Sequence, residues 1–205
     1  MAPASRGRYA RLFKPVFDRV VGLVLLVLTL PILIVAAIAI RLKIGSPILY
    51  TQDRVGFNGE TFNLYKFRTM IQDRRQTNVD FEGSERRVTH KSPEDPRVLP
   101  LGKTLRSFRL DELPQFWNVV NGDMSLVGPR PELPEIVAEY EDWQHGRHDV
   151  KPGVTGPWQI SERNGKAMHE CTETDIEYIE DVRFSTDLSI LVRTPIAMIG
   201  GRRGY

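Results

Sequence analysis

The chain has 205 residues, enough for one domain of ordinary size or for a small domain with an appendage. Its 28 basic and 26 acidic residues leave a formal net charge of +2, so the composition shows no overall bias towards nucleic-acid binding. The single cysteine, Cys171, excludes an internal disulfide framework and a cysteine-rich zinc site, and it fits a reducing compartment.

The N-terminal region contains an apolar run at residues 20–40, VVGLVLLVLTLPILIVAAIAI, without a charged residue. A helix of this length rises about 30 Å, which matches the hydrocarbon core of a bilayer. The run is long for a signal peptide, and Arg41 and Lys43 follow it where small residues would be expected. We therefore predict a basic N-terminus with a membrane helix at residues 1–44 and a globular domain at residues 45–205.

Two features bear on whether this helix spans the membrane. Basic residues flank both of its ends, and because such residues prefer the cytoplasmic side, both flanks favour the same side. Pro31 lies near the middle, where it removes a backbone hydrogen bond and kinks the helix. A re-entrant helix that dips into one leaflet and returns satisfies both observations. A straight single-pass helix with a tolerated proline is the alternative.

The region beyond residue 44 mixes short strands with helices, which predicts an α/β fold that is rich in helices and has a small sheet. Residues 46–50 (SPILY) and the alternating apolar residues at 62–67 predict strands. Three segments have the apolar spacing of helices: 101–122, 131–145 and 172–184. Two segments are expected to be loops: 72–96, which is polar and charged, and 150–160, which is rich in Pro and Gly.

The C-terminal segment 188–203 is apolar, but Arg193 and Pro195 interrupt it. It is therefore too short and too interrupted to span a membrane. Two alternatives are open: the segment lies in the membrane interface as an amphipathic helix with its basic end near head groups, or it packs against the globular core.

The central stretch 110–132, LDELPQFWNVVNGDMSLVGPRPE, begins with two adjacent carboxylates, Asp111 and Glu112. Pro114 is tolerated only in the first turn of a helix, so a helix is predicted to start at about Asp111. Acidic residues at that end stabilise a helix by about 0.3–1 kcal/mol, which alone could explain the pair. Adjacent helical residues point about 100° apart, so the two carboxylates are expected to face different partners.

Arginines on both sides of the pair indicate an anionic substrate. Arg106 and Arg109 lie upstream and can clamp a phosphate through their planar guanidinium groups, and the GPRP corner at residues 128–131 fixes a third arginine. A phosphate-bearing substrate with Mg²⁺ accounts for this mixture, since carboxylates bind the metal and arginines take phosphate oxygens. A free aspartate beside a phosphorus atom can also attack it and form an acyl phosphate.

These residues make the chain resemble the bacterial sugar transferases, the monotopic polyprenyl-phosphate phosphoglycosyl transferases. The resemblance extends from about Pro15 to Asn164. It is carried by five motifs in order: PVFDRVVG, SPILYTQDRVGFNG, LYKFRTM, LGKTLRSFRLDELPQFWNVVNGDMSLVGPRPELP and VKPGVTGPWQI. Each motif is weak alone except the long central one, and the ordered set is highly specific.

The resemblance implies a reaction on the cytoplasmic face of a bacterial inner membrane. A sugar-1-phosphate moves from a UDP-sugar onto a polyprenyl phosphate such as undecaprenyl phosphate, and this step opens assembly of a cell-surface glycan such as an exopolysaccharide, capsule or lipopolysaccharide. Asp111 is implied as the nucleophile that releases UMP, and Glu112 as the residue that assists with Mg²⁺ and protons. Arg106 is implied to hold a phosphate. The further candidates for substrate contacts are Lys66, Arg68, Arg130, Gln115 and Asn118.

The resemblance also favours the re-entrant form of the anchor. Members of the family commonly have Ser-Pro at the membrane break, where the hydroxyl can satisfy a freed carbonyl. Here the pair is Leu30-Pro31, and Thr29 is the residue that can take over this role. Thr29 and Pro31 are therefore the predicted break.

Other functions are possible from the sequence. The basic N-terminus precedes a membrane segment, so anionic phospholipid head groups suit it better than nucleic acid. An anchored scaffold without turnover would not need the acidic pair with its arginines, and a hydrolase that releases sugar phosphate to water would not need a membrane acceptor. The sequence does not name the sugar or the oligomeric state.

Overall fold

The computed structural model describes residues 7–70, 98–161 and 171–199, and the predicted loop at 72–96 lies outside these ranges. The α-helices in them are α1 Lys14–Lys43, α3 Pro100–Ser107, α4 Gln115–Asn121, α5 Pro134–Val137, α6 Pro157–Ile160, α7 Thr172–Glu180 and α8 Phe184–Ile199. The strands are β1 Leu49–Val55, β2 Thr61–Phe67, β3 Ser125–Val127 and β4 Gly153–Thr155. Tighter and wider turns complete the path: a π-helical turn at Tyr9–Phe13 and 3₁₀ segments at Phe57–Gly59, Leu110–Glu112 and Asp142–Asp149.

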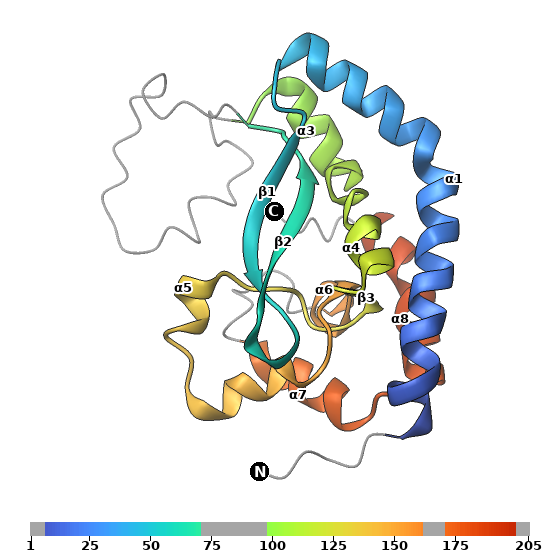
Figure 1. Ribbon diagram of the computed structural model, residues 1–205, viewed down its shortest axis with the longest axis vertical. Helices are drawn as coiled ribbons and strands as arrows, with labels where there is room; N and C mark the ends of the chain where they lie inside the picture. Colours follow the sequence, from blue (N-terminus) through green and yellow to red (C-terminus); the bar gives the residue numbers. More distant parts are fainter. Residues whose placement is uncertain (1–6, 71–97, 162–170, 200–205) are drawn as a thin grey trace.

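The sheets are small, and the predicted helix-rich architecture is confirmed (Figure 1). β1 and β2 form an antiparallel hairpin in which Leu49 faces Phe67. Asn58 and Gly59, with φ of 55° and 79°, make the tight connection, because a Gly and an Asn tolerate this left-handed conformation best. β3 and β4 form a separate parallel pair.

Helix α1 is one continuous helix that contains Pro31, and it changes direction about halfway along its length (Figure 1). By length and composition it is the one helix of the described residues that could cross a membrane. The hydroxyl of Thr29 donates to the carbonyl of Leu25 at 2.7 Å. Pro31 has no backbone N–H, so the carbonyl of Val27, four residues earlier, lacks its helical donor. Thr29 does not donate to that carbonyl, so it does not take the predicted role at the break.

The globular domain packs against both halves of α1. Phe17 and Val21 from the first half contact a core cluster built around Val119, and Ile40 from the second half is fully buried in a cluster with Leu105. The opposite face of α1 is apolar and bare, with exposures from about half to two-thirds: Val20, Leu23, Val24, Val27, Leu28, Leu30, Ile34, Val35 and Ile38. The helix therefore has one face in the core of the domain and one face available to lipid.

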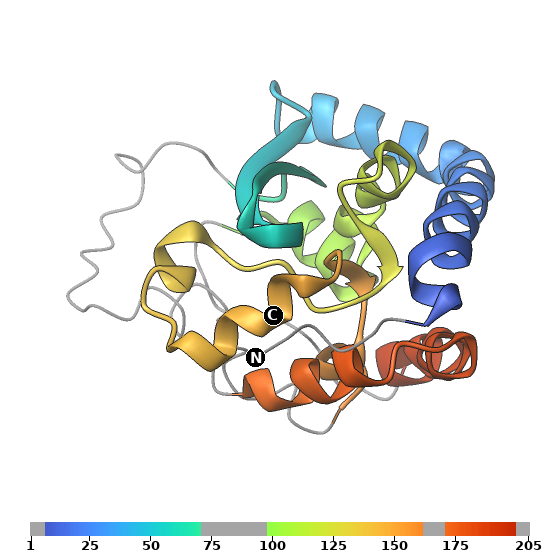
Figure 2. The same ribbon diagram turned by 60° about the horizontal axis from the view of Figure 1, so that its bottom comes forward.

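Helix α8 lies beside the start of α1 in both views (Figure 1 and Figure 2). The buried carboxylate of Asp187 on α8 joins the two helices, since Lys14 pairs with it at 2.6 Å and Tyr9 donates to it at 2.7 Å. Ile190 is buried on the same side of α8, whereas Val192 is exposed. Packing of the C-terminal segment against the core is thus confirmed for one face. Its placement in a membrane interface stays a prediction.

The prediction of one continuous helix at 101–122 is wrong. The structure divides it into α3, the 3₁₀ turn and α4, so the helix that follows the two carboxylates begins at Gln115 rather than at Asp111. The cause is Arg109, whose φ of 52° breaks the helical path. Pro114 is the residue that precedes the first turn of α4.

Other boundaries also differ from the sequence-based expectation. The segment 131–145 forms only the short α5 and the start of a 3₁₀ helix, because Glu141 is extended and caps the latter through Gln144. The strand expected at 46–50 begins at Leu49 and extends to Val55. The expected loop 150–160 contains β4 and α6. The helix expected at 172–184 ends at Glu180, and the C-terminal apolar segment is helical despite Pro195.

The buried guanidinium of Arg68 closes the C-terminal end of α1. Its two terminal nitrogens donate to the carbonyls of Ile44 and Ser46, both at 2.8 Å. Carbonyls at the end of a helix have no partner within the helix, so this side chain satisfies the junction between α1 and β1. The described contacts of Arg68 are therefore structural.

We expect Arg68→Ala to destabilise the fold by about 1–3 kcal/mol, because two carbonyls lose charged donors. This should lower the midpoint of thermal unfolding, measured for the full chain in nanodiscs. Arg41→Ala, which removes an exposed basic residue near the same helix end, is the control and should leave the midpoint unchanged. If the midpoint of thermal unfolding were unchanged and substrate binding were weaker, Arg68 would instead be a substrate contact, as the resemblance implies.

Candidate active site

The two carboxylates lie on a short 3₁₀ turn that links α3 to α4. Arg109 precedes this turn in the left-handed conformation, which costs a non-glycine residue about 1–2 kcal/mol. The turn is closed by the backbone N–H of Glu112, which donates to the carbonyl of Arg109 at 3.2 Å. Since Pro114 caps the start of α4 with its fixed φ, the backbone on both sides of Asp111 and Glu112 is constrained.

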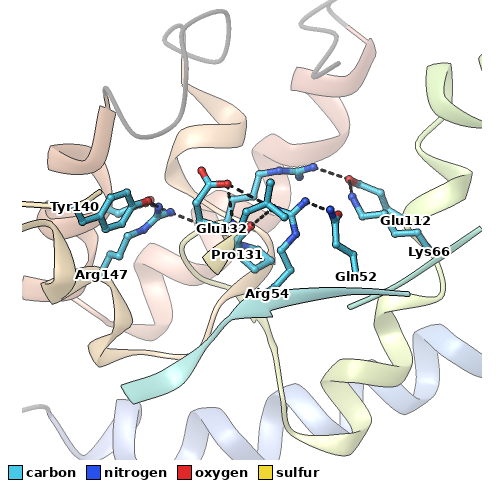
Figure 3. A network of polar contacts seen from close by, with 11 residues as sticks. Gln52, Arg54, Lys66, Glu112, Pro131, Glu132, Tyr140 and Arg147 are labelled. Atoms are coloured by element: carbon cyan, nitrogen blue, oxygen red, sulfur yellow. Dashed lines mark hydrogen bonds and ion pairs between the residues drawn. The ribbon is translucent and has the colours of Figure 1, made fainter. Parts of the chain in front are cut away.

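Glu112 is surrounded by cations. Its Oε1 contacts Nζ of Lys66 at 3.2 Å and Nη2 of Arg130 at 2.8 Å. Its Oε2 lies 3.5 Å from Nη1 of Arg109. Figure 3 shows Glu112 beside Lys66, with the dashed contacts continuing towards the GPRP corner. The three basic residues come from β2, from the chain before the 3₁₀ turn and from the corner, so Glu112 joins three segments.

The electrostatics of the site follow from this arrangement. Burial acts to raise the pKa of Glu112, but Arg130, Lys66 and Arg109 together hold it well below its usual range. Burial lowers the pKa of Lys66, and Glu112 opposes that effect. Glu112 raises the pKa of Arg130. The charged forms of Glu112 and Arg130 therefore stabilise each other, and Glu112 is a fixed negative charge.

Asp111 has a different environment, as the sequence predicted. Within the described residues its carboxylate forms no ion pair and no side-chain hydrogen bond with another residue. Burial raises its pKa, the neighbouring charge of Glu112 adds to that effect, and Lys66 and Arg106 act against it. A desolvated carboxylate that is not engaged by a cation retains its lone pairs for a substrate or a metal.

The remaining predicted site residues divide into two groups. Arg106 lies in the last turn of α3, and its Nε donates to the hydroxyl of Thr69 at 2.9 Å, so the side chain is oriented while its charge acts on Asp111. Asn118 is fully buried and bonds the backbone of β2 at Asn63 and Tyr65, at 2.8 and 3.1 Å. It therefore joins α4 to β2.

Gln115 begins α4 and is almost completely buried. Gln115 and Arg68 stay candidates for substrate contacts because the family resemblance implies them. The described contacts of Arg68 are with carbonyls. The structure thus brings together four of the predicted residues, namely Lys66, Asp111, Glu112 and Arg130, and it places Arg106 next to them.

Sequence reasoning missed a set of buried charges behind the GPRP corner. Arg54 on β1 pairs with Glu132 at 3.4 Å, and Arg147 pairs with Asp175 at 2.7 Å. Arg54 lies inside one of the quoted motifs, so a charged residue in a predicted strand was a usable signal. Arg147 lies just after the predicted helix 131–145, where no element was predicted, and nothing in its local pattern indicates burial.

The site fits Mg²⁺ through two carboxylates rather than through a protein cage. The described residues contain no group of three or more His, Cys, Asp or Glu side chains that could hold a metal. Mg²⁺ is commonly held by one or two carboxylates and completes its coordination with water and substrate phosphates. The carboxylate of Asp111 is available, and Oε2 of Glu112 has only the longer contact to Arg109. These two residues could hold the ion next to a diphosphate.

Taken together, a partly buried carboxylate without an ion pair in the described residues, a second one fixed among cations and a helix with a lipid-compatible face suit a transferase that acts on a phosphate-bearing substrate. The bacterial sugar transferase family matches residues 9–201 of the chain. Over 183 residues the chain is 40% identical to the uncharacterized sugar transferase EpsL of Bacillus subtilis, which covers 89% of this chain and 85% of that protein.

Two further relatives extend this finding. The exopolysaccharide production protein ExoY of Sinorhizobium fredii is 34% identical over 198 residues, covering 94% of this chain and 88% of ExoY. The UDP-glucose:undecaprenyl-phosphate glucose-1-phosphate transferase of Escherichia coli is 36% identical over 192 residues, covering 90% of this chain but only 39% of that protein. The chain belongs to the bacterial sugar transferase family, and it is a transferase.

We expect Glu112→Gln to lower the pKa of Lys66 further, because burial and the like charge of Arg130 then act against Asp111 alone, without the stronger opposing carboxylate of Glu112. The measurement is the pH dependence of amine acetylation at Lys66, read by mass spectrometry of the full chain. Labelling of the exposed Lys103 is the internal reference and should be the same in both proteins. An unchanged Lys66 profile would show that the ion pair with Glu112 does not set its charge.

Proposed function

We propose that this protein transfers a sugar-1-phosphate from a UDP-sugar to undecaprenyl phosphate, through a covalent phosphosugar on Asp111. The observation that carries the proposal is the contrast within the acidic pair: Glu112 is fixed by three cations, whereas Asp111 has no ion pair among the described residues. The names of the relatives support the substrates, since the Escherichia coli protein is named for UDP-glucose and undecaprenyl phosphate. The name of the relative ExoY supports a role in exopolysaccharide production.

The proposed chemistry has two displacements at one phosphorus atom. A carboxylate oxygen of Asp111 attacks the phosphorus that carries the sugar, the bond from this phosphorus to the bridging oxygen breaks, and UMP leaves with that oxygen. A phosphate oxygen of the polyprenyl phosphate then attacks the same phosphorus, the bond to Asp111 breaks, and the carboxylate is regenerated. The product is a polyprenyl diphosphate sugar, and the kinetics are ping-pong.

The basic residues would balance the charge of the diphosphate during these steps. Arg106 is held by Thr69 close enough to act on Asp111, so its free guanidinium nitrogens suit a phosphate oxygen. Lys66 and Arg130 lie next to Glu112 and add positive charge at the same place. Mg²⁺ bound at the acidic pair would supply Lewis-acid stabilisation of the diphosphate.

We also propose that α1 is a re-entrant anchor, which holds the domain on the cytoplasmic face of the inner membrane. The support is the packing of the domain against both halves of α1, from Phe17 to Ile44. A helix that crosses the bilayer in a straight line would have its middle surrounded by lipid and could not contact one extramembrane domain along its length. A bent helix lying shallowly in one leaflet can, and it leaves both ends on one side.

The Asp111→Asn variant should fold and insert but lose at least about 10³-fold in turnover, because it lacks the nucleophile. Turnover is measured as UMP release by the full chain in nanodiscs with Mg²⁺, undecaprenyl phosphate and individual UDP-sugars. Asp53→Asn, which changes an exposed carboxylate on the β-hairpin, is the matched control and should retain activity.

The same experiment identifies the intermediate. Brief incubation with the donor alone should add the mass of a sugar phosphate to the peptide that contains Asp111. Near-normal UMP release by Asp111→Asn would remove Asp111 from this role, and UMP release without any covalent adduct would favour direct transfer between the two substrates.

The topology of α1 is tested by cysteine labelling at its two ends. In a Cys171→Ala background, Gly7→Cys and Ser46→Cys should both react with an impermeant maleimide in inside-out membrane vesicles and neither should react in intact spheroplasts. Both sites are exposed, and detergent-treated vesicles give the total signal. Labelling of the two sites from opposite sides would establish a single-pass helix and exclude the re-entrant form.

A further inference from the structure

The corner that carries Arg130 is held through the carbonyl oxygens of successive residues. The carbonyl of Pro129 accepts a hydrogen bond from the backbone N–H of Gly153 at 2.8 Å. The carbonyl of Glu132 accepts one from the backbone N–H of Val55 at 2.9 Å. The flanks of the corner are therefore attached to β4 on one side and to β1 on the other.

Arginine side chains hold the two carbonyls in between. Nη1 of Arg54 donates to the carbonyl of Pro131 at 3.3 Å and pairs with Glu132. Nη2 of Arg147 donates to the carbonyl of Arg130 itself at 2.8 Å. Figure 3 shows both arginines converging on the corner, Arg147 from the side of Tyr140 and Arg54 from the strand below it. Four consecutive carbonyls thus have protein donors.

Arg147 is itself deeply buried and doubly anchored. Its side chain and that of Asp175 are each only 1% exposed, and they form an ion pair at 2.7 Å. Its Nη1 also donates to the hydroxyl of Tyr140. A buried ion pair usually adds little stability over a well-packed apolar pair, because both charges lose their hydration. Here the ion pair instead fixes the position of the Arg147 guanidinium, which donates to the backbone carbonyl of Arg130.

We propose that Arg147 is a positioning residue for the active site. It does not contact Glu112. By holding the carbonyl of Arg130, it determines where the Arg130 guanidinium meets Glu112, at 2.8 Å from Oε1. The structural part of this proposal stands on the contacts alone, and its kinetic part rests on the phosphosugar transfer proposed above.

The structural part is tested by hydrogen–deuterium exchange in the peptide that contains the corner, with the full chain in nanodiscs. Arg147→Lys retains the charge opposite Asp175, but one ammonium cannot reproduce the fork of a guanidinium that reaches Tyr140 and Arg130. Exchange at Gly128 and Leu133 should accelerate, because their backbone N–H groups flank the corner and donate to the carbonyl of Thr155 and to Oε1 of Glu132, both at 3.0 Å. Tyr140→Phe is a milder variant that removes only one contact of Arg147.

Tyr9→Phe is the matched control. It also deletes a tyrosine hydroxyl that bonds a buried charged residue, in this case Asp187, but it does so at the start of α1, far along the chain from the corner. Its corner peptide should exchange as in the wild type. Unchanged exchange at the corner in folded Arg147→Lys and Tyr140→Phe would overturn the proposal, whatever the enzyme's substrate is.

The kinetic part is tested by a double-mutant cycle with Arg130→Ala. Arg147→Lys should lower kcat/KM by about 10²-fold, the scale expected for a small misplacement of a site residue. Tyr140→Phe should lower it by about three- to tenfold, the loss expected for one hydrogen bond. In the Arg130→Ala background, neither substitution should cause a further loss, because the residue that they position is already gone.

The outcomes separate this proposal from the proposed reaction. Additive losses in the double variants would show that Arg147 acts on stability or on another residue, and they would overturn the proposal. Accelerated exchange at the corner in a chain that releases no UMP with any donor would support the positioning contact and reject the proposed reaction instead.

Discussion

Neutralisation of the Glu112 carboxylate is the interaction on which the arrangement of the site depends. A buried carboxylate is costly unless cations compensate it, and Glu112 draws them from three segments: Lys66 from β2, Arg109 from the chain before the 3₁₀ turn and Arg130 from the corner. Lys66 and Arg130 are far from Glu112 in sequence, so the ion cluster brings the hairpin and the corner to the acidic pair. One consequence concerns its neighbour. Because Glu112 engages these cations, Asp111 is left without an ion pair in the described part of the chain.

Helix α1 belongs to the core of the domain as much as it belongs to the exposed apolar surface. Gly22 lies so close to Val119 on α4 that an added Cβ would come within 2.8 Å of a Val119 methyl carbon. At the other end, Arg68 binds the carbonyls of Ile44 and Ser46 directly after α1, and the next residue, Thr69, accepts the hydrogen bond from Arg106. The apolar helix and Arg106, which we propose holds a phosphate, are thus joined by two consecutive residues.

The sequence was informative where the signal is local or where residues form motifs. The apolar run, the presence of two strands near residues 46–67 and the acidic pair with its arginines could all be predicted. The start of the helix after Asp111 was predicted wrongly because the left-handed conformation of Arg109 has no sequence signature of the kind that a glycine gives. Arginine is also ambiguous by itself: Arg68 and Arg106 lie in similar basic motifs, yet the described contacts of Arg68 are with carbonyls, while the charge of Arg106 acts on Asp111. The buried pair behind the corner depends on tertiary contacts that no local pattern encodes.

The two prolines of the GPRP corner have a consequence for the way an anion is recognised there. Neither Pro129 nor Pro131 has a backbone N–H, so this corner cannot bind phosphate through consecutive amide groups as glycine-rich loops do. At the same time, the carbonyl oxygens from Pro129 to Glu132 are all engaged by protein donors, so none of these partial negative charges is left unpaired to repel an approaching phosphate. In the proposed reaction, recognition at this corner would be left to the guanidinium of Arg130, which favours ligands that present two oxygens in one plane.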